Sequence, residues 1–334
     1  MSTTIQLGHG SGGPMMRGLI ERVLLRGATA PEALAMGDGA AIPFGGRWLV
    51  LTTDAHVVQP VEFPGGDIGR LSICGVVNDL AMMGATEVLG ITSSVIVEEG
   101  FELECLSRLQ ESMRRASEEA SAPVLTGDTK VMRRGELDGI VLSSSGVGVT
   151  DRVIRDSGLR PGDSIVVTGT VGDHGLAVLS ARERLGLTGD LRSDVAPLNG
   201  LVRVALDAVG DAVHAMKDPT RGGVISALSE MSTKAGVAIR LDASTIPVSA
   251  AARAAAELLG IDPLIVANEG KALIGVSSGS LDALLRALRA HPLGREAACI
   301  GRVESGERGA LFLDTGFGTR RLYERDGDPL PRIC

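Results

Sequence analysis

Aromatic side chains are scarce in this chain. Phe, Trp and Tyr make up only 2% of the 334 residues, whereas hydrophobic residues as a whole make up 44%. The hydrophobic cores must therefore be built from Ala, Val, Leu, Ile and Met. The formal net charge is −8 and the arginines are dispersed along the chain, which argues against a nucleic-acid-binding surface.

Long hydrophobic runs are also missing. No apolar segment has the length that a bilayer span needs, and the N-terminus lacks a basic stretch followed by an apolar one. We therefore expect no membrane association. Only four cysteines occur, at positions 74, 105, 299 and 334, and no two of them have Cys-x-x-Cys spacing. This pattern offers no disulfide framework and favours a reducing compartment, the cytoplasm.

The last residue of the chain is a cysteine, Cys334. It follows the run Asp-Gly-Asp-Pro-Leu-Pro at 326–331, whose composition is typical of turns and extended chain. A prenylation signal is excluded, because it requires three residues after the cysteine. We predict a mobile tail over 323–334 that carries a thiol at its tip.

Strand and helix patterns alternate along the rest of the chain. A polar stretch at 151–162 ends in Pro-Gly and predicts a joint between two domains. We therefore predict an N-terminal domain over 1–155 and a C-terminal domain over 156–322, each of α/β or α+β class, with the strand order left open. The predicted strands cover 47–54, 88–97, 123–126, 139–149, 164–168, 237–241, 271–276, 297–303 and 310–314. The longer predicted helices cover 14–24, 67–83, 103–120, 198–209, 248–259 and 280–290.

A glycine-rich loop opens the first predicted helix. It contains Gly10, Ser11, Gly12 and Gly13 and is followed by Pro14, which suits a first helical turn. The amides of such a helix start are suited to an anion. The loop is not a Walker A motif, since no Gly-Lys-Ser/Thr follows, and a flexible terminal segment is the alternative.

Acidic residues recur beside glycines or hydroxyl residues in the first half of the chain. These acids are Asp38, Asp54, Asp79 and Asp128. Each alone is typical of a cap or turn, but together they suit a hard-cation site that holds Mg²⁺ against phosphates. Lys130 follows Asp128 closely and could neutralise phosphate charge, with a solvated lysine as the alternative.

The second half contains a candidate general base. Glu269 follows the apolar run at 264–267, so partial burial could raise its pKa, although a turn or cap role is the alternative. His174 lies in a Gly-Asp-His-Gly loop and could contact substrate or be structural. The segment 218–223 resembles a helix start for an anion, while Cys74 and Cys105 fall on apolar helix faces and are expected in the core.

Taken together and in order, these motifs resemble a known family. The strings are GHGSGG, TTD, PGGDIG, VNDLAMMGA, TGDTKV, GDHG, DPTRGG, ANEGK and the terminal PRIC, and they extend over nearly the whole chain. The middle motifs are similar to those of the AIR-synthetase-like (PurM-like) ATP-binding superfamily. The terminal PRIC narrows the resemblance to the HypE family of hydrogenase maturation proteins.

The resemblance implies a two-domain PurM-like fold that binds ATP and Mg²⁺ and forms a homodimer through its N-terminal domains. It implies that Cys334 receives a carbamoyl group from the carbamoyltransferase HypF. ATP-dependent dehydration then yields a thiocyanate, whose cyano group passes to iron on the HypC–HypD complex for [NiFe]-hydrogenase. Lys130 and Glu269 are implied as catalytic. The implied nucleotide-binding residues are Gly10, Ser11, Gly12, Gly13, Asp54, Asn78, Asp79, Gly127, Asp128 and Thr129, and the implied metal ligands are Asp38, Asp54, Asp79 and Asp128.

Two other functions remain open from the residues alone. One is a kinase of the same superfamily that acts on a free small molecule, which would keep its activity after Cys334→Ala. The other is a nucleotide-gated scaffold, which would bind ATP without consuming it when a carbamoyl donor is supplied.

Overall fold

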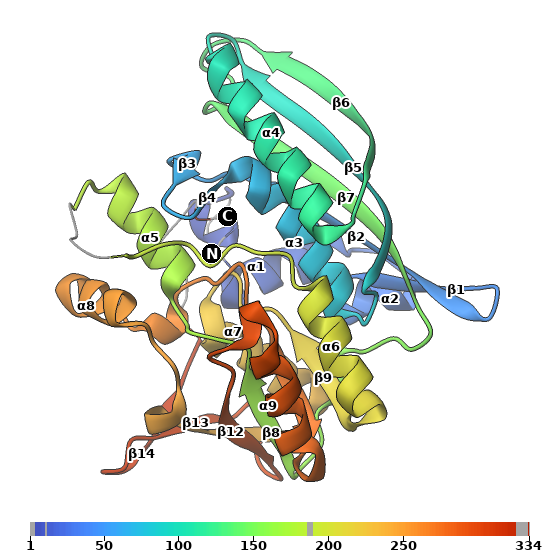
Figure 1. The fold of residues 1–334 in the computed structure, drawn as a ribbon, viewed down its shortest axis with the longest axis vertical. Helices are drawn as coiled ribbons and strands as arrows, with labels where there is room; N and C mark the ends of the chain where they lie inside the picture. The colour runs from blue at the N-terminus through green and yellow to red at the C-terminus, as the bar shows by residue number, and fades with distance from the viewer. Residues whose placement is uncertain (1–3, 11, 186–189, 325–332, 334) are drawn as a thin grey trace.

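The computed structural model describes residues 4–10, 12–185, 190–324 and 333. Their strands form two large sheets, one from each half of the chain, and the small pair β3 (Glu62–Phe63) and β4 (Gly66–Asp67). Figure 1 shows the first sheet above and the second below, with helices between and around them. No helix among the described residues is both long and apolar enough to cross a bilayer.

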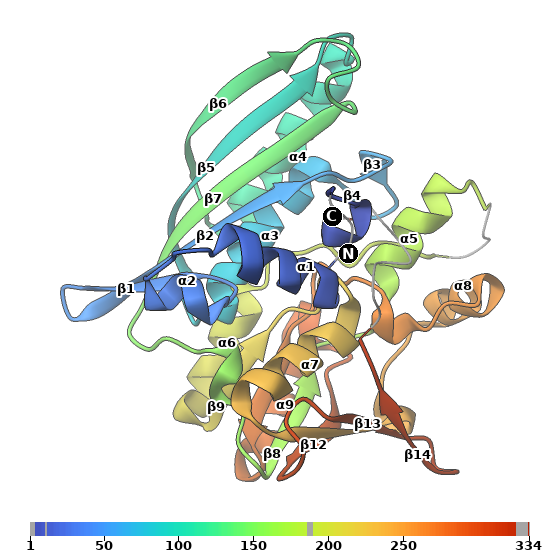
Figure 2. The same ribbon diagram turned by 180° about the vertical axis from the view of Figure 1, so that it is seen from behind.

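The first sheet is mixed and has the order β1-β2-β7-β5-β6. Only the β5–β6 pair is parallel. Its strands are β1 (Ala40–Phe44), β2 (Arg47–His56), β5 (Glu87–Glu98), β6 (Val124–Met132) and β7 (Ile140–Thr150). Helices α3 (Ile68–Met82) and α4 (Leu103–Ala120) cover one face. No helix of the described residues covers the other face over β5, β6 and β7 (Figure 2).

The two covering helices follow their sequence patterns. The Asp67 side chain caps α3 by accepting a hydrogen bond of 2.9 Å from the Arg70 amide, as N-cap residues do. On α4, the apolar spacing predicts that Leu103, Leu106, Leu109 and Met113 face inward. Leu109 and Met113 are buried, whereas Leu103, in the first helical turn, is 79% exposed, so the prediction for Leu103 is wrong.

The second sheet has the order β14-β13-β10-β12-β8-β11-β9 and is antiparallel except for the β10–β13 pair. Its strands are β8 (Asp163–Val167), β9 (Val213–Lys217), β10 (Ala238–Asp242), β11 (Leu273–Ser277), β12 (Ala298–Glu304), β13 (Leu311–Asp314) and β14 (Thr319–Leu322). On β8, Val166 packs with helices α6 (Asn199–Val209) and α9 (Leu281–Ala290). Its neighbours Ile165 and Val167 belong to the core with α7 (Gly223–Ala235), so helices sandwich this sheet.

Shorter elements connect the two halves. The N-terminal segment forms η1 (Leu7–Gly10), α1 (Gly13–Leu19), the π-helical η2 (Ile20–Leu24) and α2 (Pro31–Ala35). Figure 2 shows α1 between the first sheet and α7. Helices α5 (Asp173–Arg182) and α8 (Ala250–Leu259) pack together beside the second sheet.

The structure differs from the sequence expectations at several strands. The short strands β1, β9 and β14 were not predicted. The strand predicted to start at 123–126 and to run into 127–130 is β6, which continues to Met132. The buried residues Cys74 and Cys105 are in the core, as predicted, and both are free thiols, as is Cys299.

Candidate active site

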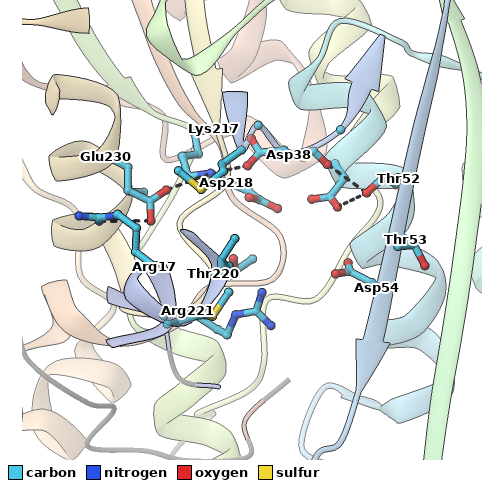
Figure 3. A pocket seen from close by; sticks show the side chains of 18 of the residues that line it. Arg17, Asp38, Thr52, Thr53, Asp54, Lys217, Asp218, Thr220, Arg221 and Glu230 are labelled. Atoms are coloured by element: carbon cyan, nitrogen blue, oxygen red, sulfur yellow. Dashed lines mark hydrogen bonds and ion pairs between the residues drawn. The ribbon is translucent and has the colours of Figure 1, made fainter. Parts of the chain in front are cut away.

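A cavity of about 840 Å³ lies between the two domains. Its walls come from the N-terminal helices, from β2 and α3 of the first domain, and from the segments around 217–234 and 269 of the second. Figure 3 shows acidic, basic and hydroxyl side chains of both domains pointing into this space. Most of the predicted site residues can be judged by their position relative to this cavity.

Two glycine-rich loops meet at one wall of the cavity. Gly12 and Gly13 line it with φ angles of 78° and 68°, which glycine adopts readily. A Cβ on Gly12 would lie 3.1 Å from the Arg221 Cβ, so the N-terminal loop packs directly on the 218–223 segment. Gly10 ends η1 outside the lining, and Ser11 falls outside the described residues.

Three of the four predicted metal ligands share the cavity: Asp38, Asp54 and Asp79. The Thr52 hydroxyl lies 2.7 Å from Asp79 Oδ2 and donates to it. Burial, followed by the nearby carboxylates of Asp54 and Asp218, raises the pKa of Asp79 well above its usual value. The cavity therefore concentrates negative charge that a cation would relieve.

Asp218 belongs to the same acidic group and was not predicted as an acid of the site. Burial and the Asp38 carboxylate raise its pKa to about 7. Its position directly before Pro219 and the glycine pair was the sequence feature that pointed to this segment.

The fourth predicted ligand, Asp128, is elsewhere. It lies on the exposed edge strand β6, where its carboxylate is 2.8 Å from Lys130 Nζ, and both side chains are more than 60% exposed. Asp128 on β6 pairs with Ser94 on β5, which pairs with Ser143 on β7. Ser143 pairs in turn with Ala55 on β2, so the four residues form one row across the sheet. Ala55 lines the cavity, so Asp128 is three strand spacings away, roughly 14 Å. Consistently, no three His, Cys, Asp or Glu side chains of the described chain are arranged as a metal site.

Lys217 is a cavity residue that the sequence interpretation missed. It ends β9, has a side chain that is only 13% exposed, and forms an ion pair with Asp38 of the other domain. Burial alone would lower the pKa of Lys217, but Asp38 and then Glu230, 3.6 Å away, raise it well above its usual value. The lysine is thus held charged between the domains. Its only sequence indication was its place directly before the 218–223 motif.

Asn78, predicted to bind nucleotide, does not line the cavity. Its amide group donates to the carbonyls of Ala196 at 3.1 Å and Glu269 at 3.0 Å. Its carbonyl accepts from the Leu198 amide at 2.7 Å. Asn78 therefore joins α3 to the second domain, and its effect on the cavity is indirect, through Asp79 and Glu269.

Glu269, the predicted base, lines the cavity and is only 3% exposed. Burial first, and then the carboxylates of Asp218 and Asp194, raise its pKa well above the usual value. Within the described residues, its Oε1 has no hydrogen-bond partner, and the same holds for Nδ1 of His56, which also lines the cavity. These two unpaired polar atoms are available to a bound group.

The C-terminal end of the chain approaches this region. Glu324 forms an ion pair of 3.0 Å with Arg17 of α1, and Ile333 is buried with its carbonyl 2.9 Å from Nε2 of His174. Residues 325–332 and Cys334 lie outside the described residues. The mobility expected for this tail stays a prediction, but its two described ends are in contact with the domains.

Known proteins resemble this chain over both domains. The N-terminal domain of the AIR synthase related protein family matches residues 36–150 and its C-terminal domain matches residues 160–314. A carbamoyl dehydratase HypE from Cupriavidus necator is 47% identical over 339 residues, which cover 100% of this chain and 95% of the relative. A solved HypE–HypF complex matches with a TM-score of 0.87 and 39% identity, covering 92% of this chain and 99% of the other. A HypE structure in complex with ATP matches with a TM-score of 0.83 and 37% identity over 99% and 100% of the two chains.

Proposed function

The chain belongs to the HypE family of carbamoyl dehydratases, and we propose that Cys334 carries the carbamoyl group that this enzyme dehydrates with ATP during hydrogenase maturation. The observation that carries the proposal is the buried carboxyl group of Glu269 in the cavity, whose Oε1 has no hydrogen-bond partner among the described residues. Near it in the chain, Ala267 contacts Gly175 at the start of α5, where His174 contacts Ile333. Cys334 follows Ile333 directly in the sequence, so docking of the Ile333 carbonyl on His174 would hold the thiol close to this region.

The reaction needs ATP because an amide oxygen is a poor leaving group. Transfer of the γ-phosphoryl group to the oxygen of the S-carbamoyl group makes it leave as phosphate when the C–O bond breaks. The two N–H protons leave the nitrogen as the C≡N bond forms, and the sulfur keeps its bond to carbon. Glu269 accepts one of these protons and the departing phosphate takes the other. The raised pKa of Glu269 makes it hold the proton that it receives.

The nucleotide phosphates bind where the two glycine loops meet. Gly10, Ser11 and Gly12 precede α1 and Gly13 is its first residue. The free amides of this helix start favour an anion, and Arg221 lies against Gly12. Mg²⁺ fits the acidic part of the cavity, since Asp38, Asp54 and Asp79 supply hard oxygen ligands. Burial, and then the nearby carboxylates, raise the pKa of Asp79. Mg²⁺ commonly uses one or two carboxylates together with phosphates, so a preformed triad is not required. When bound, it offsets phosphoryl charge.

The remaining predicted residues, Gly127, Asp128, Thr129 and Lys130, require a second copy of the chain. No helix in the described part of the chain covers the face of β6 that carries Asp128 and Lys130 (Figure 2), and both residues are too far from the cavity of their own chain. Two copies associate through this face, and the 127–130 segment of one copy completes the nucleotide site at the interface. Lys130 then neutralises charge on the transferred phosphoryl group.

A partner must supply the carbamoyl group and another must take the product. A HypF-type carbamoyltransferase loads Cys334, in line with the HypE–HypF complex among the similar structures, and a HypC–HypD complex accepts the cyano group. The free thiols of Cys74, Cys105 and Cys299 agree with a reducing compartment, the cytoplasm.

The deciding experiment is mass spectrometry of the C-terminal peptide after incubation with ATP, Mg²⁺, carbamoyl phosphate and the carbamoyltransferase. We expect a carbamoyl adduct on Cys334 that loses one water only when ATP is present. Cys334→Ser is the matched control and should show no thiocyanate. An unmodified cysteine, with the transferase active on a known acceptor, would favour the small-molecule kinase. Dehydration without ATP would contradict the proposal.

A further inference from the structure

His174 is a fully buried histidine at the start of α5, with both ring nitrogens in contact with polar groups. Its Nδ1 lies 2.8 Å from the Ser193 hydroxyl and its Nε2 lies 2.9 Å from the Ile333 carbonyl. The Phe63 ring packs edge-on against the imidazole, with 5.4 Å between ring centroids. The ring is therefore fixed in position, and one of its partners belongs to the C-terminal tail.

The contacts determine which nitrogen carries the proton. A backbone carbonyl can only accept, so Nε2 is the protonated nitrogen that donates to Ile333. Burial lowers the pKa of His174 and keeps the ring neutral, although Asp194 and the hydrogen bond to Ile333 act in the opposite direction. Nδ1 then accepts from the Ser193 hydroxyl, whose oxygen also accepts from the Val195 amide at 3.1 Å. One tautomer satisfies every group in this chain of hydrogen bonds.

The bonded tail residue lies beside the segment that leads to the proposed base. A Cβ on Gly175 would lie 3.4 Å from Ile333 Cδ1 and 3.4 Å from the Ala267 amide nitrogen. The Gly175 amide donates to the Ala267 carbonyl at 3.2 Å. Ala267 precedes Glu269 by one intervening residue, so the Ile333 peptide and Glu269 approach the same end of α5.

We propose that His174 is a positioning residue whose Nε2–H bond to the Ile333 carbonyl docks the last peptide of the chain for dehydration. This rests on the proposed function of Cys334. Because the bond joins a neutral donor to a neutral acceptor, it is worth only about a tenfold shift in the docking equilibrium. A bond of that strength can be released each time the cysteine has to meet its carbamoyl donor or its acceptor.

A matched pair of variants separates docking from general stability. In His174→Gln the side-chain amide reaches the position of Nε2 and can still donate to Ile333. In His174→Asn the amide reaches only the position of Nδ1, so it retains Ser193 and loses Ile333. Both variants place a neutral amide in the same buried site.

The first measurement is the rate at which iodoacetamide alkylates Cys334 in the full chain, read by peptide mass spectrometry. We expect His174→Asn to react faster than wild type, by up to about tenfold, because it loses one neutral hydrogen bond. His174→Gln keeps that bond and should stay within about twofold of wild type. Cys74 in the same digest reports unfolding, because burial raises the pKa of its thiol to about 12. Equal rates in all three proteins would overturn the proposal, and so would faster alkylation of Cys74 together with Cys334.

The second measurement is the ATP-saturated dehydration rate of protein that is already carbamoylated. His174→Asn should be slowed in proportion to its lost docked fraction, so that this slowing and the gain in alkylation rate multiply to about tenfold. Its KM for ATP should be unchanged and its loading rate should not fall, and His174→Gln should be close to wild type. Equal slowing in both variants would show a merely structural role. Since alkylation is measured without a carbamoyl donor, failure of Cys334 to accept carbamoyl would refute the proposed function without affecting the docking result.

Discussion

Replacement of Glu269 by glutamine tests the electrostatics of the active site directly. The side chain is buried, and burial with nearby carboxylates raises its pKa well above 4.5. The folded protein therefore keeps the Glu269 proton at pH values where the unfolded chain has lost it. Glutamine has nearly the same shape as the protonated acid and does not titrate. Glu269→Gln therefore removes only the pH dependence of stability that comes from this group.

The sign and the size follow from proton linkage. Below pH 4.5 the Glu269 carboxyl group is protonated in both the folded and the unfolded state. The free energies of unfolding of wild type and variant then differ by a constant. As the pH rises from 4.5 toward the folded pKa, the native state binds more protons than the unfolded state. Over this window the wild-type free energy of unfolding falls by about 1.4 kcal/mol per pH unit relative to the variant. The variant should therefore become progressively more stable than wild type between pH 5 and the folded pKa.

The assay is denaturant unfolding followed by circular dichroism, from pH 5 to pH 8, in EDTA and without nucleotide. Glu307→Gln is the matched control, because the exposed Glu307 pairs with Arg321, which lowers the pKa of Glu307. That residue titrates below the measured range, so its variant should keep a constant difference from wild type. A constant difference for Glu269→Gln as well would refute the raised pKa.

The same variant tests the catalytic role. Glu269→Gln should load carbamoyl on Cys334 at the wild-type rate and dehydrate it about 10²- to 10⁴-fold more slowly, the usual contribution of a general base. The wild-type dehydration rate should rise with pH up to the folded pKa of Glu269, since only the carboxylate can accept the proton. Normal thiocyanate formation by the variant would remove Glu269 from this role.

Lys130→Ala should permit carbamoylation and stop dehydration in the same peptide assay. It should leave the melting temperature unchanged, because the ion pair of Lys130 with Asp128 is exposed. Normal thiocyanate formation would exclude Lys130 from catalysis. Ile96→Glu places a charge beside Lys130 on the open face of the first sheet and should convert a dimer to a monomer, as measured by light scattering. The control Leu103→Glu lies on the other side of the sheet, is 79% exposed, and should leave the dimer intact. A dimer that survives Ile96→Glu would rule out this face. Lys217→Met leaves Asp38 buried without its partner and should lower the free energy of unfolding by about 3–5 kcal/mol, and a loss below about 1 kcal/mol would contradict a buried ion pair between the domains.

The sequence by itself determined the local elements and the family. Helix α4 begins and ends at the predicted residues, and the strand predicted at 139–149 is β7, Ile140–Thr150. These elements depend on the spacing of apolar residues over one helix or strand, which neighbouring residues alone specify. The glycine loops and the terminal PRIC likewise identified the HypE family without any knowledge of packing.

Only the tertiary structure decided which of the candidate residues meet. Asp38 and Lys217 are 179 positions apart and pair across the domain boundary, and His174 and Ile333 are 159 positions apart. Asp128 carries the same kind of motif as Asp79, but strand order places it at the exposed edge of the sheet, away from the cavity. Strand order and domain contact result from burial of whole faces, and the raised pKa of Glu269 results from that burial. Such properties arise from the packing of distant segments, which no local pattern encodes.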